Sequence, residues 1–278
     1  MNAGRQRVAV AGASGRMGRM LIEAIADSSD LALCGAMDVP DSAAIGSDPL
    51  APLGRRSGIV VTSDPDAALA DASVLIDFTR PEGTLRHLAA CRAHGCAAVV
   101  GTTGLTSAHK AGIAEHAQHI AIVLAPNMSV GVNVALMLVA QAARALDDEW
   151  DVEIVEMHHR MKVDAPSGTA LQMGEVVARG RGTTLEAADL PARQGETGVR
   201  RRGAIGFASL RGGDVVGDHT VVFAGAGERI EITHRSASRA GYADGSLRAA
   251  RFLRGRAPGL YDMADVLGMK PAATRTSA

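Results

Sequence analysis

Apolar positions in the first half of the chain form short continuous runs, typical of buried strands, separated by stretches with apolar residues at helical spacing. The expected strands are 7–11, 31–37, 58–62, 73–78, 97–101 and 120–125, and the expected helices are 16–27, 65–71, 82–95 and 107–118. Strands that alternate with helices form parallel sheets joined by right-handed crossovers. The pattern predicts an α/β fold, a Rossmann-type doubly wound parallel sheet, with ligands at the carboxyl ends of its strands.

The alternation of expected strands and helices ends near Ser129. We expect a long apolar helix over 130–146, a strand over 150–156, and, after a loop, a helical pattern over 171–177. Strand-like runs follow at 202–211, 218–224 and 228–236, with glycine-containing turns between them, and 239–254 is helical again. Consecutive strands joined by short turns predict an antiparallel meander. The second half is therefore expected to form an α+β domain.

A glycine-rich turn follows the first expected strand directly and opens a helix, with the sequence Gly12-Ala-Ser-Gly15-Arg-Met-Gly18. Glycines let the chain turn tightly, let the backbone approach a pyrophosphate, and let the helix pack close to the strand. The next strand ends at Asp38, 20 residues beyond Gly18, about where a ribose-binding acid is expected. We predict a dinucleotide site made of Gly12, Ala13, Ser14, Gly15, Arg16, Met17 and Asp38. A tight strand–helix turn without a ligand is the alternative.

Three polar segments each follow one of the later strands of this half. They begin at Asp77, Gly101 and Ala125. Because the carboxyl ends of parallel strands meet at one edge of the sheet, these segments are expected to form one rim that holds the nicotinamide half of a cofactor. The rim residues assigned to the cofactor are Gly101, Thr102, Thr103, Ala125, Pro126, Asn127 and Met128.

A basic cluster follows the strand at 150–156. Four potentially cationic side chains, His158, His159, Arg160 and Lys162, lie within five positions. The sequence Ser167-Gly-Thr169 then opens a helix, and unpaired amides at a helix start suit a carboxylate. Cations and helix-end donors together form a clamp for a small dicarboxylate, and a histidine and a lysine can move protons. A solvated basic loop would have the same composition.

Composition narrows the class of protein. The chain has 278 residues and a net charge of −1, which favours one or two domains and gives no reason to expect nucleic acid or an anionic membrane as partner. Its three cysteines lack metal-ligand spacing and are expected to be reduced thiols, with no metal site. No apolar run approaches the ~20 residues of a membrane span, and the start has no signal-peptide core. We expect a cytoplasmic protein.

The remaining histidines are expected to be structural or solvated. Five lie on expected helix faces that look exposed, and two lie in expected strands, where a structural role is favoured. They are His87, His94, His109, His116 and His119 on helices, and His219 and His234 on strands.

The motifs together resemble those of the 4-hydroxy-tetrahydrodipicolinate reductase (dihydrodipicolinate reductase) family of bacterial lysine and diaminopimelate synthesis. They run in order over nearly the whole chain, and the block HHRxKVDAPSGTA is specific to this family. The matching segments are 8–18, 77–84, 101–104, 127–133, 156–170, 203–207 and 217–220.

The resemblance implies an NAD(P)H-dependent oxidoreductase. Hydride would pass to C4 of the dihydropyridine-type species formed from 4-hydroxy-tetrahydrodipicolinate, giving tetrahydrodipicolinate. By position, His158 is a proton donor or acceptor and Lys162 a proton donor. His159, the amides of Gly168 and Thr169, and the Thr169 hydroxyl bind a substrate carboxylate. Strand alternation could point Arg160 away from the site.

The resemblance also implies a domain plan. Residues 1–128 and 241–278 would form the dinucleotide-binding domain, and residues 129–240 an inserted domain for substrate binding and homotetramer formation, with the active cleft between them. The cofactor is NADH and/or NADPH, with a lean to NADH. Asp38 would repel a 2′-phosphate, and Val39 stands where NADPH-using members commonly carry arginine, although Arg16 could pair with the phosphate.

Two other functions stay open at this point. One is a different nicotinamide oxidoreductase with the same two-domain plan, such as a small amino-acid dehydrogenase. The other is a catalytically silent regulator that senses a dinucleotide, because fold alone does not determine function. The specific HHRxKVDAPSGTA block disfavours the first, and retention of both His158 and Lys162 disfavours the second.

Overall fold

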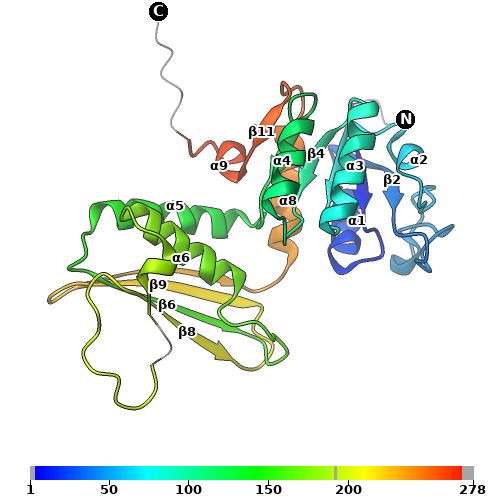
Figure 1. Ribbon diagram of the computed structural model, residues 1–278. Helices are drawn as coiled ribbons and strands as arrows, with labels where there is room; N and C mark the ends of the chain where they lie inside the picture. The colour runs from blue at the N-terminus through cyan, green and yellow to red at the C-terminus, as the bar shows by residue number, and fades with distance from the viewer. Residues whose placement is uncertain (1–3, 191–192, 271–278) are drawn as a thin grey trace, which may run out of the picture. The chain divides into compact units, whose positions relative to one another are not determined.

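The computed structural model describes residues 4–190 and 193–270, and the chain divides into two compact units (Figure 1). The first unit runs to Val130 and resumes at Tyr242, and the second is Gly131–Gly241. The boundaries expected from the sequence, after residues 128 and 240, compare with observed boundaries after 130 and 241.

The first unit contains a six-stranded parallel sheet in the order β11-β5-β4-β3-β1-β2. Its strands are β1 Gln6–Ala11, β2 Leu31–Met37, β3 Val74–Asp77, β4 Ala97–Val100, β5 Ala121–Leu124 and β11 Gly259–Tyr261. Its helices are α1 Arg16–Asp27, α2 Pro65–Leu69, α3 Pro81–Ala93, α4 Ser107–His116, α8 Ala240–Phe252 and α9 Met263–Val266.

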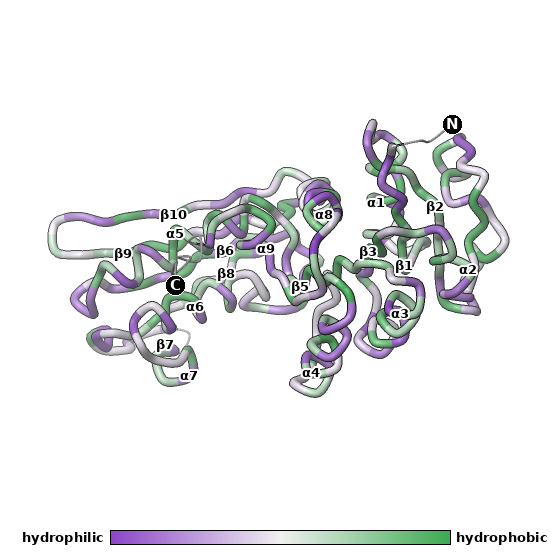
Figure 2. The backbone as a smooth tube through the Cα atoms, turned by 90° about the horizontal axis from the view of Figure 1, so that it is seen from above, coloured by the Kyte–Doolittle hydropathy of each residue, from purple (hydrophilic) through white to green (hydrophobic). Residues whose placement is uncertain are grey.

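Helices cover both faces of this sheet. Figure 2 shows α1 and α8 on one side of the strands, and α3 and α4 on the other. Because side chains alternate along a strand, Val8 and Val10 of β1 belong to the core with α1 and α8, while Ala9 and Ala11 belong to the core with α2, α3 and α4. The predicted Rossmann-type doubly wound α/β fold is confirmed.

One expected strand of this sheet is wrong. Residues 58–62 form no strand, and their backbone pairs with the sheet only at a bridge between Thr62 and Met37. Val61 is buried, but its backbone bonds with Gly46 and Ser47 of the preceding loop and not with a neighbouring strand. The sixth strand is β11, which is too short to give a clear alternation in sequence.

The second unit has a five-stranded mixed sheet in the order β10-β9-β6-β8-β7. Its strands are β6 Asp151–His158, β7 Asp189–Leu190, β8 Ile205–Arg211, β9 Gly217–Ala224 and β10 Arg229–Ser236. Its helices are α5 Val130–Ala145, α6 Gly168–Gly180 and α7 Leu185–Ala188. Helices α5 and α6 lie on one face of the sheet (Figure 1).

The expected antiparallel meander is wrong for β8. This strand pairs in parallel with β6, and β6 separates it from β9. The connection from β8 to β9 crosses the end of β6, where Gly212 N donates to His158 O and Arg160 N donates to Gly213 O. Only β9 and β10 form a hairpin.

Strand β6 alternates cleanly between the two faces of the sheet. Val152 and Ile154 are buried against the helices, and so are Glu156 and His158 on the same face. The periodicity that buries the apolar residues therefore also buries a carboxylate and an imidazole.

Candidate active site

The glycine turn joins β1 to α1 in a conformation that requires glycine. Gly12 has φ +71°, and a Cβ on Gly18 would lie 2.0 Å from the Gly12 carbonyl oxygen. Helix α1 therefore packs directly on the turn. Its first residues have no side-chain cap at Gly15, so its amino-terminal amides suit an anion.

A cavity of about 820 Å³ opens beside this turn. Among the residues expected to bind cofactor, it is lined by Gly12, Ser14, Gly15, Arg16, Met17 and Asp38. Ala13 is buried behind the turn and donates its N–H to Met37 O. Sequence reasoning did not assign the other basic side chains that line the cavity, Arg80 and Arg86.

Asp38 is held as an anion at the end of β2. Its Oδ2 accepts a 2.7 Å hydrogen bond from Ser14 N, and its Oδ1 accepts one of 2.8 Å from Val39 N. Burial alone would raise the pKa of Asp38, but hydrogen bonds from Ser14, Val39 and Ser42 outweigh it and lower the pKa. The carboxylate is thus charged beside the cavity.

The rim residues follow the strands as expected, since β4 ends at Val100 and β5 at Leu124. Gly101 packs against the Phe78 ring, and a Cβ there would lie 2.2 Å from it. The buried Thr102 hydroxyl bonds to that of Thr84 at 2.7 Å. Thr103 and Pro126 are exposed, whereas Ala125, Asn127 and Met128 are buried. None of the assigned rim residues 101–103 and 125–128 lines the cavity beside the glycine turn.

His87 is buried, contrary to the expected exposed position. Its Nδ1 lies 2.9 Å from Asp77 Oδ2, and Asp77 Oδ1 accepts bonds of 2.7 Å from both Thr79 N and Thr79 Oγ1. This network holds the turn after β3 that lines the cavity. Helical spacing could have predicted this burial, because His87 lies on the same face of α3 as the buried Thr84, Leu88 and Cys91.

The second cluster lies in the other unit, at the end of β6. His158 Nδ1 is 2.5 Å from Glu156 Oε2, and Arg211 of β8 makes a bidentate ion pair with Glu156 at 2.8 and 2.9 Å. The His219 ring meets the His158 ring edge-on, with centroids 5.1 Å apart. Sequence reasoning assigned a role to His158 but none to Glu156 or Arg211.

The start of α6 joins this cluster. Ser167 caps the helix, with its Oγ accepting from Ala170 N at 3.2 Å and lying 2.9 Å from His219 Nε2. Ser167 N donates to Glu156 Oε1 at 3.3 Å. Gly168 is exposed, and Thr169 is half-buried. The structure thus brings His158 and the first turn of α6 together.

The loop between β6 and α6 carries the other predicted residues. Lys162 is half-buried, and its Nζ lies 2.7 and 2.8 Å from the two carboxylate oxygens of Asp164. His159 is half-buried, and Arg160 is exposed, as strand alternation suggested.

Opposing effects set the charges of this cluster. Burial alone would raise the pKa of Glu156, but hydrogen bonds from Arg211, Ser209 and His158 lower it to about 2. Burial lowers the pKa of His158, the Glu156 carboxylate raises it, Lys162 and Arg211 lower it, and the net shift is downward. Burial, with a smaller effect from His158, lowers the pKa of His219 to about 4. The site therefore contains an anionic glutamate and neutral histidines.

Two family models together match nearly the whole chain. The model described as dihydrodipicolinate reductase, N-terminus, matches residues 6–128, and the model for the C-terminus matches residues 131–267. The chain belongs to the dihydrodipicolinate reductase family. It is therefore an oxidoreductase, and both alternatives left open by the sequence are set aside.

Curated relatives of this reductase are similar along their full lengths. A 4-hydroxy-tetrahydrodipicolinate reductase from Herminiimonas arsenicoxydans is 58% identical over 266 residues, covering 96% of this chain and 99% of the relative. One from Aromatoleum aromaticum is 60% identical over 264 residues, covering 95% and 96%. A solved dipicolinate-bound dihydrodipicolinate reductase from Paenisporosarcina sp. TG-14 shares the fold, with TM-score 0.75, 22% identity, and 94% and 98% coverage.

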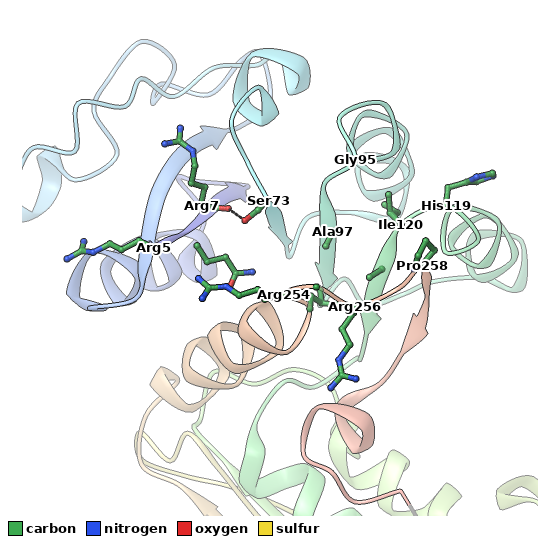
Figure 3. Close-up of a pocket in the computed structure, with 14 residues that line it drawn as sticks. Arg5, Arg7, Ser73, Gly95, Ala97, His119, Ile120, Arg254, Arg256 and Pro258 are labelled. Atoms are coloured by element: carbon green, nitrogen blue, oxygen red, sulfur yellow. Dashed lines mark hydrogen bonds between the residues drawn. The ribbon is translucent and has the colours of Figure 1, made fainter. Parts of the chain in front are cut away.

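The reductase has another hollow, of about 540 Å³, at the amino-terminal ends of the strands in the first unit (Figure 3). Its basic side chains do not converge. Figure 3 shows Arg5, Arg7 and Arg256 pointing in different directions; Arg7 pairs with Asp71, and Arg256 stacks on Phe252. We assign it no ligand, because open α/β sheets bind ligands at the opposite, carboxyl ends of their strands.

Among residues 4–190 and 193–270, no cluster of three or more histidine, cysteine or acidic side chains could hold a metal ion. Within the same residues, every helix is too short or too polar to cross a bilayer.

Proposed function

We propose that the protein reduces 4-hydroxy-tetrahydrodipicolinate, by way of dihydrodipicolinate, to tetrahydrodipicolinate, using NADH or NADPH. The observation that carries this proposal is the cluster of His158, Glu156 and the α6 start in a chain 56–60% identical to reductases of that name. When bound, the cofactor supplies a hydride to ring C4, and a protein group supplies the balancing proton.

The substrate's two carboxylates call for fixed donors. We assign one carboxylate to His159, the amides of Gly168 and Thr169, and the Thr169 hydroxyl. The supporting observation is that α6 begins at Gly168 and presents its positive end there. The exposed Asp164 pairs with Lys162 in the free protein, and an incoming dianionic substrate would take the place of Asp164.

Proton movement falls to His158 and Lys162. The Nδ1 of His158 is occupied by Glu156, which leaves Nε2 to give or take a proton. His158 favours the neutral form in the free protein because its pKa is lowered. A bound dianion would raise that pKa and make the imidazolium a better acid. Lys162 serves as a proton donor once released from Asp164.

The cofactor is assigned to the cavity beside the glycine turn. Gly12, Ala13, Ser14, Gly15, Arg16 and Met17 would follow the pyrophosphate, and Asp38 would accept bonds from the adenosine ribose diol. Gly101, Thr102, Thr103, Ala125, Pro126, Asn127 and Met128 are assigned to the nicotinamide half. The charged Asp38 supports a lean to NADH, whereas Arg16, Arg80 and Arg86 in the same cavity are candidate partners for a 2′-phosphate.

The oligomeric state and the cellular location of the protein are part of the same proposal. We propose a cytoplasmic homotetramer built through the second unit, which also binds the substrate. The face of the five-stranded sheet opposite α5 and α6 carries Val155, Met157, Val222 and Leu210, and Leu210 is half-exposed. Apolar side chains on an open sheet face favour burial against another copy.

The direct test is turnover by the purified protein. Freshly generated 4-hydroxy-tetrahydrodipicolinate should cause loss of NADH absorbance, with tetrahydrodipicolinate as product by mass spectrometry. Cofactor binding without turnover of this substrate would contradict the proposed reaction.

A further inference from the structure

Glu156 is an ionised side chain that the proposed reaction does not itself use. It is fully buried, with a relative exposure of 0%. A buried carboxylate is costly unless its oxygens are well paired. Both oxygens are paired here: Oε2 bonds to His158 and Arg211, and Oε1 bonds to Arg211 and Ser167 N.

We propose that Glu156 is the positioning residue of the reductase, holding His158 in the tautomer with Nδ1 protonated so that Nε2 faces the proton transfer. The proposal rests on the proposed function for what Nε2 does, but not for which tautomer exists. A carboxylate that orients a catalytic imidazole in this way acts through it and does not touch the substrate.

The sheet positions both members of the pair and their arginine partner. Glu156 and His158 are two residues apart on β6, so both point to the helix-covered face. Arg211 stands opposite His158 in the β6–β8 register. Its guanidinium pairs with Glu156 and also donates a hydrogen bond of 2.6 Å to Asp164 O. Arg211 therefore links Glu156 to the loop that carries Lys162.

The Nε2 side of the imidazole faces Gly217, which has no side chain to cover it. A Cβ at that position would lie 3.0 Å from His158 Nε2, closer than a side chain normally packs. No residue in the described ranges, 4–190 and 193–270, hydrogen-bonds to that nitrogen. The His219 ring packs edge-on against the His158 ring, with an angle of 76° between the ring planes. Nδ1 is therefore the anchored atom, and Nε2 the available one.

Titratable groups surround His158 on the adjoining elements. They are Glu156 on its own strand, Arg211 on β8, His219 on β9 with His234 beyond it on β10, and Lys162 with its partner Asp164 on the loop. Glu156 raises the pKa of His158, while Lys162 and Arg211 lower it. Removing the glutamate charge should move the titration of His158 to lower pH.

The decisive measurement is ¹⁵N NMR of the His158 ring in the full-length protein, assigned by the signal that His158→Gln removes. Wild type should show a protonated Nδ1 and an unprotonated Nε2 near neutral pH. Glu156→Gln keeps the shape and removes the charge, and should give mixed tautomers. It should lower kcat about 10- to 100-fold, the usual effect of losing an orienting partner, with a smaller change in KM.

Glu153→Gln is the matched control. Glu153 lies on the same strand but the opposite face, and also pairs with arginines, Arg193 at 2.6 Å and Arg200 at 3.0 Å. This variant should keep the wild-type tautomer, kcat and pH profile. An equal kcat loss in both variants would show a general effect of losing a strand charge and would overturn the proposal.

A second variant tests the proposal in case Glu156→Gln does not fold. Glu156→Gln leaves the Arg211 charge without its partner, which destabilises the fold, whereas Glu156→Gln combined with Arg211→Met removes both charges. The double variant should show the same mixed tautomers. A protonated Nε2 in wild type, or an unchanged tautomer in a folded variant, would overturn the proposal. The wild-type spectrum needs neither a folded variant nor substrate, so failure of turnover would count against the proposed function alone.

Discussion

The Asp38 carboxylate accepts a 2.7 Å hydrogen bond from the backbone amide of Ser14. Ser14 stands where a dinucleotide-binding turn commonly has its middle glycine. The bond ties the end of β2 to the turn after β1, and it keeps the Asp38 charge at the wall of the cavity that Arg16, Arg80 and Arg86 also line. We therefore expect cofactor choice to depend on how the charge of Asp38 balances these three arginines.

We expect kcat/KM for NADH to equal or exceed that for NADPH, because the charged Asp38 repels a 2′-phosphate. Val39→Arg should raise the use of NADPH, since Val39 is 59% exposed at the cavity wall. Steady-state kinetics with both cofactors in one buffer give the ratio. The control is Val60→Arg, at a similarly exposed valine that does not line the cavity.

A wild-type preference for NADPH of about tenfold, or roughly 1.4 kcal/mol, would contradict this prediction. It would show that the arginines outweigh Asp38. Arg16→Ala, Arg80→Ala and Arg86→Ala, measured with both cofactors, would then identify the one that binds the phosphate.

His158→Gln and Lys162→Ala should each lower kcat by ~10²–10⁴, the usual contribution of a general acid or base. Neither change removes apolar core, so the thermal unfolding temperature should change little. Lys110→Ala, at an exposed lysine on α4, is the control and should keep wild-type turnover. Near-wild-type kcat in both His158→Gln and Lys162→Ala would contradict the assignment.

The free energy of unfolding should fall as the pH drops from about 6.5 toward 4. His219 is buried and neutral, and its pKa is lowered from 6.5 to about 4. Between these values the unfolded chain binds a proton that the folded chain does not, so acid favours unfolding. Urea unfolding at pH 7.5 and pH 5 measures the difference.

His219→Gln removes the titrating ring and keeps a group that can bond to Ser167. Its unfolding free energy should depend less on pH over the same range. An identical pH dependence in wild type and variant would show that other groups, such as His158, carry the whole effect.

Light scattering at micromolar concentration should give the mass of four chains. Leu210→Glu places a charge on the open sheet face and should reduce that mass. Val199→Glu changes a fully exposed valine outside the strands and should leave the mass unaltered. A monomeric wild-type protein would contradict the tetramer.

The sequence alone predicted the Rossmann-type half, because its signals are local. Buried parallel strands are continuous apolar runs, and the Gly12–Gly18 turn can be recognised from its spacing after a strand. Family membership was likewise carried by local motifs, above all the block after Glu156. The short β11 was missed and the irregular segment 58–62 was wrongly assigned as a strand, because three to five residues contain too little periodicity.

Tertiary structure decided what depends on pairing between distant segments. Strand order is one example, because β8 and β9 follow each other in sequence but pair on opposite sides of β6. That order brings Arg211, 55 residues away in sequence, onto Glu156. It also places His219 on β9 beside Ser167, 52 residues away in sequence. In the first unit, the packing of α3 on the sheet makes His87 a buried partner of Asp77. Local pattern shows which face a residue occupies, whereas its partner on that face is set by how the strands and helices pack together.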